Sequence, residues 1–362
     1  MRNRKRLLVA LLVASVTAVA LGDPGLVHAQ ATIVIDVLDG PGEGFNDPGA
    51  PDSASAAGRN AGATLGDQRF VAFTYAADIW AGLLDSSQAI VVGATFDPLL
   101  CEASTASLGA AGTNTVHRDF KGAPVSNTWY PAALANALAG ADLAPGNDDI
   151  DAFFNSAVDD AACEFPKVWY YGLDGNPPAG TIDFVSVVLH ELGHGLGFQS
   201  FVNLSTGSRL NDVDDIFMLW LENHPTGALF PEMTDATRVA ASVNTGNLHW
   251  AGPDVVAQSS GLTSGRHPSG HVEMYAPDPQ DPGSSVSHFS TSLSPDELME
   301  PSFTGATHDV GLAAALMQDI GWSTSSSLKT TAGPAADASS SDGGGGGSCF
   351  IATMIGSHNN AQ

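Results

Sequence analysis

The chain has 362 residues, of which 43% are hydrophobic and 14% are charged. This composition is too apolar for a disordered chain, and the length is enough for about two domains or lobes. Acidic residues number 39 against 13 basic ones, which gives a formal net charge of −26 at pH 7. Because phosphate binding needs clustered positive charge, this balance argues against nucleic acid as a partner.

Residues 1–29 have the three-part order of a secretory signal peptide: a basic start, an apolar run over residues 7–21, and Val27-His28-Ala29. We expect cleavage after Ala29 or Ala31, a folded body that begins near residue 30, and a secreted or envelope-associated, extracellular bacterial protein. The apolar run has 15 residues, short of the roughly 20 that a helix needs to cross a bilayer. No transmembrane span is therefore expected.

The first part of the body has an α/β pattern. Residues 32–38 and 88–96 are β-branched runs that are apolar on both faces, which predicts interior strands of a covered sheet. Steps of three and four residues between them predict an amphipathic helix on that sheet, through Phe70, Phe73, Ala77, Trp80 and Leu84. Further strands are expected at residues 113–119, 149–155 and 167–172.

A predicted helix over residues 181–198, capped by Asp183 or Thr181, carries the chemistry. In it His190, Glu191 and His194 form the pattern H-E-x-x-H. Four residues advance a helix by just over one turn, about 6 Å, so both imidazoles can bind one ion. Zinc is the expected metal, with three protein ligands and an open position for water. We expect Glu191 to take a proton from that water and pass it to the leaving amine.

The residues after this helix restrict the third ligand. Gly195 and Gly197 permit the left-handed conformation that ends a helix. The compact metzincin pattern H-E-x-x-H-x-x-G-x-x-H has Gly197 in place, but Ser200 stands where its third histidine would be. The third ligand must therefore come from further along the chain. The candidates are His224, His249, His267, His271, His288 and His308, with Asp214, Asp215 and Glu222 as carboxylate options.

A resemblance to a known family selects one of these candidate ligands. It is carried by the segment from Ser287 to Trp322, SHFSTSLSPDELMEPSFTGATHDVGLAAALMQDIGW. Together with HELGHGLGF it resembles the leishmanolysin-type metzincins, whose third histidine follows a long insertion and precedes a Met-turn. The resemblance implies that His288 is the third zinc ligand and that Met299 packs beneath the site. It also implies a metzincin-like zincin: an upper lobe, about residues 31–197, with a twisted mixed sheet and two helices, and a smaller, mostly irregular or helical lower lobe, about residues 198–322. Residues 310–320 are expected to form a closing helix.

The function expected from these motifs is a zinc metalloendopeptidase that acts on protein or peptide substrates. One alternative ligand scheme uses Asp214, which precedes a predicted helix over residues 215–222 and is equally suited to be its N-cap. An alternative from another class is a catalytically silent surface adhesin that keeps zinc as a structural part, although an intact Glu191 argues against a purely structural site. Clustered Asp212, Asp214 and Asp215 also raise the hypothesis of bound calcium.

Three cysteines and the C-terminal region complete the sequence. In an oxidising compartment Cys101 and Cys163 are able to pair, which leaves Cys349. Residues 323–348 have the composition of a flexible linker. The end piece, residues 349–362, resembles the cysteine-box tails (CFIATAAYGS-like) of bacterial envelope proteins, although Met354 and Ile355 depart from that pattern. It is either an envelope attachment signal or a floppy extension.

Overall fold

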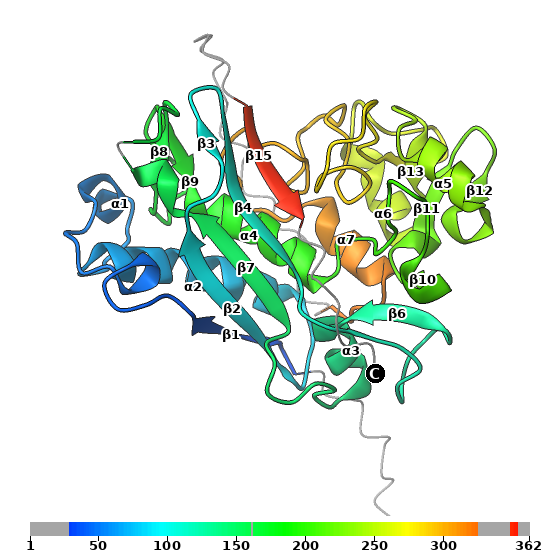
Figure 1. Ribbon diagram of the computed structural model, residues 1–362, viewed down its shortest axis with the longest axis horizontal. Helices are drawn as coiled ribbons and strands as arrows, with labels where there is room; N and C mark the ends of the chain where they lie inside the picture. Colours follow the sequence, from blue (N-terminus) through cyan, green and yellow to red (C-terminus); the bar gives the residue numbers. More distant parts are fainter. Residues whose placement is uncertain (1–28, 161, 325–347, 354–362) are drawn as a thin grey trace, which may run out of the picture.

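The computed structural model describes residues 29–160, 162–324 and, for the backbone, 348–353. The expected signal peptide, nearly all of the expected linker and residues 354–362 lie outside the described residues. The described chain forms two masses side by side, one built on the large sheet and the other on later, shorter elements (Figure 1).

The first mass contains a twisted mixed sheet with the strand order β1-β2-β7-β4-β15, and β3 pairs with β4. β4 runs antiparallel to β7, and the other neighbours along this path are parallel. The strands are β1 (Thr32–Val37), β2 (Ala89–Asp97), β3 (Cys101–Glu102), β4 (Thr105–Thr113), β7 (Ile150–Asn155) and β15 (Ser348–Thr353). Part of the C-terminal end piece is thus a strand on the edge of the sheet and not a floppy extension.

Two of the strand predictions need correction. β1 was expected inside the sheet, but it is an edge strand whose residues alternate between exposed and half-buried. The strand expected at residues 113–119 is wrong in its bounds: β4 ends at Thr113, and only the two-residue β5 (Val116–His117) lies within the rest of this range. β4 was missed because its sequence, TASLGAAGT, lacks the large β-branched residues that mark a strand. The strands predicted at 88–96, 149–155 and 167–172 are confirmed as β2, β7 and β8 (Val168–Tyr170).

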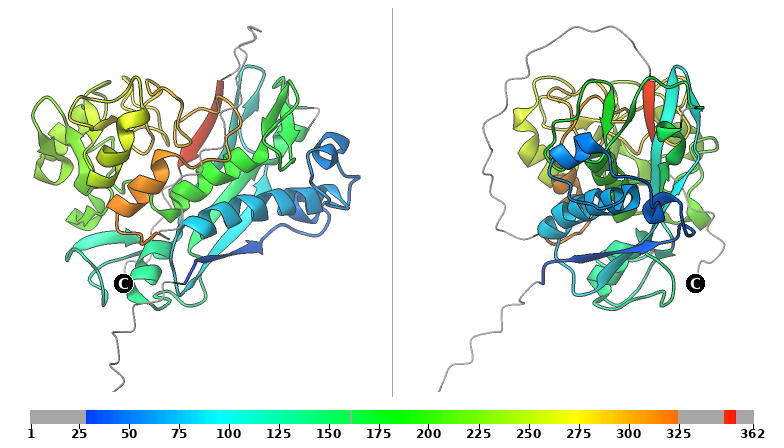
Figure 2. Two further views of the ribbon diagram at one scale, coloured as in Figure 1. Left: turned by 180° about the vertical axis from the view of Figure 1, so that it is seen from behind. Right: turned by 90° about the vertical axis from the view of Figure 1, so that its left-hand side faces the viewer.

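Helices α2 (Leu65–Leu83) and α4 (Phe184–Leu196) lie on the same face of the sheet (Figure 2). Thr64 and Asp67 form a capping box at the start of α2, which satisfies backbone N–H groups that have no partner in the helix. Trp80 of α2 is fully buried, and its indole N–H donates to the carbonyl of Leu189 in α4 at 2.9 Å. Both predicted helices are therefore confirmed, and α2 holds α4 against the sheet.

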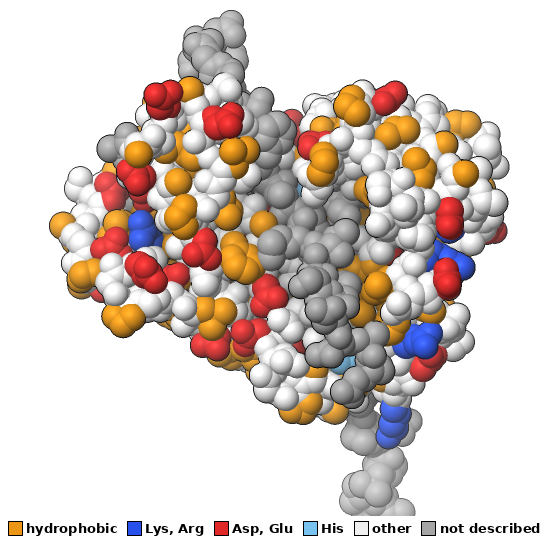
Figure 3. Space-filling model, in the orientation of Figure 1, with side chains coloured by type: hydrophobic (Ala, Val, Ile, Leu, Met, Phe, Trp, Pro, Cys, Tyr) orange, Lys and Arg blue, Asp and Glu red, His pale blue; other side chains and the backbone are white. Residues whose placement is uncertain are grey.

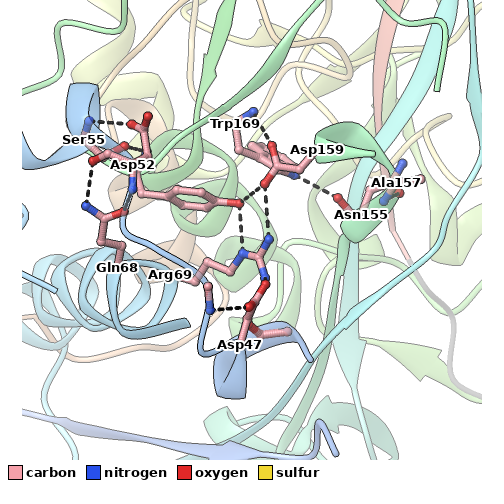
Figure 4. A network of polar contacts seen from close by, with 12 residues as sticks. Asp47, Asp52, Ser55, Gln68, Arg69, Asn155, Ala157, Asp159 and Trp169 are labelled. Carbon is pink, nitrogen blue, oxygen red and sulfur yellow. Dashed lines mark hydrogen bonds and ion pairs between the residues drawn. The ribbon is translucent and has the colours of Figure 1, made fainter. Parts of the chain in front are cut away.

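A buried polar network joins α2 to the loops around it (Figure 4). The Arg69 guanidinium lies 3.2 Å from Asp159 and 3.5 Å from Asp47, and its Nε donates to Tyr171 at 3.0 Å. Tyr171 in turn donates to Asp159 at 2.6 Å. A buried charge is tolerated when it is paired and hydrogen-bonded in this way. The network therefore anchors the N-terminal loops to the first mass.

Smaller elements complete the first mass and connect it to the second. β10 (Asp214–Asp215), β6 (Thr128–Pro131) and β5 form a three-stranded sheet, and β8 pairs with β9 (Thr181–Asp183). Because β10 comes from the later part of the chain, its pairing with β6 joins the two masses. The remaining helices here are α1 (Ser53–Ala57) and α3 (Ala132–Ala139).

The second mass has more β-structure than expected. A four-stranded antiparallel sheet has the order β12-β11-β13-β14, with bounds β11 (Leu221–Asn223), β12 (Ala228–Leu229), β13 (Leu248–Trp250) and β14 (Val272–Glu273). The helices are α5 (Asp235–Ala241), α6 (Pro253–Gln258) and α7 (Leu312–Asp319), and α7 confirms the predicted closing helix.

The helix predicted at residues 215–222 is wrong. Asp215 ends β10, and the single 3-10 turn Met218–Trp220 follows before β11 begins. The Asp215 carboxylate accepts hydrogen bonds from Ser200 and from the backbone N–H groups of Phe201 and Met218. These bonds satisfy the local backbone in a turn, so side chains compete here with helix formation.

Cys101 and Cys163 form a disulfide across 62 residues of sequence. Such a bond is typical of an oxidising compartment. Acidic side chains are spread over the face seen in Figure 3, where basic ones are few. No helix among the described residues is long and apolar enough to cross a membrane.

Candidate metal centre

Helix α4 presents its two histidines from a rigid and completely buried position. Asp183 caps its first turn by accepting from the backbone N–H of Ser186 at 2.8 Å. At the other end Gly197 has φ of +130°, a conformation that favours glycine, and the N–H of Phe198 returns to the carbonyl of Gly193 at 3.0 Å. The helix therefore ends at Leu196, two residues after the second histidine, directly before one of the two glycines that the sequence marked as an end signal.

The structure brings His190, His194 and His288 together at one point. Their Nε2 atoms lie 3.0 Å apart for His190 and His194, and 3.1 Å apart for each pair with His288. All three side chains are fully buried. His288 is separated from His194 by 93 residues, so only the tertiary fold places it here.

Backbone carbonyls fix the direction in which each ring presents its nitrogens. Nδ1 of His190 lies 2.7 Å from the carbonyl of Leu298, Nδ1 of His194 lies 2.9 Å from that of Phe198, and Nδ1 of His288 lies 2.7 Å from that of Ser284. A carbonyl only accepts, so each Nδ1 must carry the proton and donate it. In neutral rings each Nε2 atom is then unprotonated, and the lone pairs of the three Nε2 atoms face one another.

Three lone pairs at this separation repel unless a cation lies between them. A tetrahedral ion bound at about 2.0–2.1 Å needs its nitrogen ligands about 3.3 Å apart, close to the spacing observed. Hydrogen bonds from the far ring nitrogens to carbonyls are also typical of metal-ligating histidines. The residues present therefore fit a divalent metal.

The electrostatics keep the three rings neutral. Burial lowers the pKa of His190 to about 4. Burial also holds the pKa values of His194 and His288 well below their usual range, and the neighbouring imidazoles lower them further. Neutral imidazole is the form that binds a metal.

Glu191 follows His190 in α4 and packs against β4. A Cβ placed on Gly109 of β4 would lie 2.9 Å from Oε1 of Glu191, so a larger residue there would have to displace this carboxylate. Both carboxylate oxygens are buried without a hydrogen-bond partner among the described residues. Burial raises the pKa of Glu191 well above its usual value. A carboxyl group held in this state is a candidate proton acceptor next to the metal position.

A cavity of about 430 Å³ opens next to His190. Ser186 and His190 of α4 form one side, and residues 295–298 and 302–307 form the other. Phe303 supplies apolar surface, while Asp296 and Glu297 supply carboxylates. The cavity is large enough for a substrate side chain.

Other predicted candidates point elsewhere. Asp214 pairs with Arg209 at 2.9 Å, which removes it from the triad and argues against it as third ligand. Ser200 donates to Asp215, and His308 lies 3.0 Å from Asp183 at the start of α4. Two of the three aspartates proposed for calcium are thus bound to other groups, Asp214 to Arg209 and Asp215 to Ser200. Within the described residues, the side-chain groups that are arranged to hold a metal are two histidine triads.

The second triad was not anticipated from the sequence. It consists of His224, His249 and His271, which sequence analysis treated only as alternatives for a single site. Two sequence patterns could have indicated this triad: E-x-H at residues 222–224 and H-x-E at residues 271–273. In a strand, each pattern places its glutamate and its histidine on the same face.

The chain was compared with models of protein families, with curated proteins and with solved structures, and none of them matches. The resemblance to leishmanolysin-type metzincins therefore rests on the motifs alone.

Proposed function

We propose that this protein is a secreted zinc-dependent metalloendopeptidase of the leishmanolysin-like metzincin type. The observation that carries the proposal is the convergence of three bare Nε2 atoms from His190, His194 and His288, each with its Nδ1 bonded to a backbone carbonyl. Zinc bound by such a triad supplies Lewis acidity, which acidifies water and polarises a carbonyl oxygen.

Glu191 is the proposed general base. It accepts a proton on a carboxylate oxygen from the attacking water and returns it to the amine that leaves. Its position next to His190 in sequence and the complete burial of its side chain support this role.

Two features near Glu191 suit an extended peptide. β4, which packs against Glu191 at Gly109, has an edge that accepts a parallel strand, since β15 pairs with it. A peptide that adds to a sheet edge is held by backbone hydrogen bonds while pockets select its side chains. The cavity beside His190 is the proposed side-chain pocket.

The test is Glu191→Gln, which keeps the shape of the side chain and removes the base. We expect hydrolysis of casein or a peptide library to fall at least about a hundredfold, with unchanged zinc content and circular dichroism. If the wild type binds zinc at this triad yet cleaves nothing across a broad library, the protein is instead a zinc-containing adhesin or binding protein.

A further inference from the structure

The small sheet of the second mass has two chemically different faces. Leu221, Leu248, Trp250 and Val272 are fully buried on one face. Successive side chains of a strand point to opposite faces. In the strand register, Glu222 of β11 lies opposite His249 of β13, and His249 lies opposite Glu273 of β14. The opposite face therefore carries Glu222, His224, His249, His271 and Glu273.

Three imidazoles gather on this polar face. One ring nitrogen each from His224, His249 and His271 lies within 4.8 Å of the others. The rings of His224 and His249 are stacked with centroids 4.5 Å apart. A fourth ring, His267, has its centroid 3.9 Å from that of His224. Imidazoles packed this closely are arranged as ligands and not as isolated surface groups.

His249 has an unsatisfied nitrogen in this cluster. Its side chain is buried, with 3% exposure, and its Nε2 lies 3.3 Å from the carbonyl of Gly246. Because that carbonyl only accepts, Nε2 carries the proton, and Nδ1 of the neutral ring carries an unprotonated lone pair. Nδ1 is buried without a hydrogen-bond partner among the described residues. A buried acceptor with no donor costs free energy unless something occupies the site.

Glu222 is placed to orient one of the rings. Its Oε1 accepts from Nδ1 of His224 at 2.7 Å. Its Oε2 lies 2.9 Å from Nδ1 of His271, but that nitrogen has no hydrogen-bond partner among the described residues. A carboxylate on the far nitrogen of a metal-ligating histidine fixes the ring and raises its basicity. For His224 this leaves Nε2 free to bind an ion.

We propose that His224, His249 and His271 form a second metal site, with Glu222 as the group that orients His224. Imidazole ligands select borderline divalent cations such as zinc, nickel or copper. All three histidines of the first triad are buried, whereas His224 and His271 of the second are only partly buried. We therefore expect the second site to bind an ion more weakly than the first triad.

The position of this site gives it a role. It lies within the 93 residues that separate His194 from His288, and an ion there joins β11, β13 and β14. The segment that follows β14 is hydrogen-bonded to the third ligand of the first triad, because the N–H of Tyr275 donates to the carbonyl of His288 at 2.9 Å. Ser290 likewise donates to the carbonyl of Glu273 at 2.9 Å. An ion at the second site would therefore stabilise the inserted segment that positions His288.

The experiment titrates Zn²⁺ into the metal-free, full chain and follows stoichiometry by calorimetry and elemental analysis. We expect two equivalents, of which the weaker is lost in His224→Gln/His271→Gln. Glu222→Gln should weaken that equivalent by 10–100-fold. The matched control is His117→Gln, a half-buried histidine whose ring contacts Thr115, and it should keep both equivalents.

The outcome does not depend on hydrolysis. A wild-type chain that binds one equivalent still supports the second site if His224→Gln/His271→Gln abolishes that equivalent. Retention of every wild-type equivalent by this variant overturns the proposal, as does a weak equivalent that Glu222→Gln leaves unchanged. If the double variant does not fold by circular dichroism, the half-exposed single variant His271→Gln is titrated in its place and should lose at least tenfold in affinity.

Discussion

Met299 packs its sulfur directly beneath Gly193, between the two histidines of α4. A Cβ on Gly193 would lie 2.6 Å from Sδ and 3.1 Å from Cε of Met299. Met299 is fully buried, and its carbonyl accepts from the N–H of Phe289, next to His288. One methionine therefore contacts the helix of the first two imidazoles and the segment of the third.

We expect Gly193→Ala to disturb the metal centre. The added methyl group overpacks the contact with Met299, which costs about 1–3 kcal/mol, and it displaces α4 relative to His288. Urea unfolding should show the loss of stability, and zinc affinity should fall with it. The control is Gly261→Ala, where a Cβ meets no atom within 4 Å. Equal stability of the two variants contradicts the packing role.

Replacement of single ligands separates the two schemes for the first triad. His288→Ala removes one of three converging nitrogens and should abolish high-affinity zinc binding at this triad. Asp214→Ala breaks only a surface ion pair with Arg209, which is worth about 0–1 kcal/mol, and should leave zinc content unchanged. Elemental analysis of both variants is the measurement. Zinc loss in Asp214→Ala alone overturns the assignment of His288.

The edge of β4 makes a prediction about the C-terminal strand. β15 occupies this edge in a parallel register from Thr105 to Ala111, where the proposed substrate would add. A chain that ends at Thr324 lacks β15, so we expect faster hydrolysis of peptides, seen mainly as a lower KM. The same truncation with Glu191→Gln serves as control and should be inactive. An unchanged or higher KM in the truncated chain means that β15 does not compete with substrate.

Asp149 predicts a pH dependence of stability. Its carboxylate accepts from the N–H of Val91 and from Asn136, and burial raises its pKa to about 6. The unfolded chain has a pKa near 3.9 for Asp. The folded state thus holds the proton more tightly, so the contribution is full below pH 4 and is lost as the pH rises through 6.

The measurement compares urea unfolding of the wild type and Asp149→Asn between pH 4 and 7. Asparagine does not titrate, so the free energy of unfolding of the wild type should fall relative to that of the variant over this range. Two parallel curves contradict a raised pKa at Asp149.

Local sequence determined the elements whose pattern lies within one turn or one strand. The helix α4 with His190, Glu191 and His194 was predicted, and Asp183 was one of its two candidate caps, because helical spacing and capping depend on neighbouring residues; the helix is shorter than the predicted range 181–198, since residues 181–183 form β9. The same holds for β2, β7, α2 and α7. β4 was missed, because its sequence is dominated by small residues without strong strand propensity, of which Gly109 packs against Glu191.

What only the tertiary structure decided was how distant residues meet. His288 and Met299 were assigned through a family resemblance, and the fold alone shows their contact with α4. Likewise no local pattern brought His224, His249 and His271 together, because antiparallel register and not sequence distance sets which side chains share a face of a sheet. Spacing along one helix is encoded by a few neighbours, whereas the meeting of segments nearly a hundred residues apart depends on the packing of the whole core.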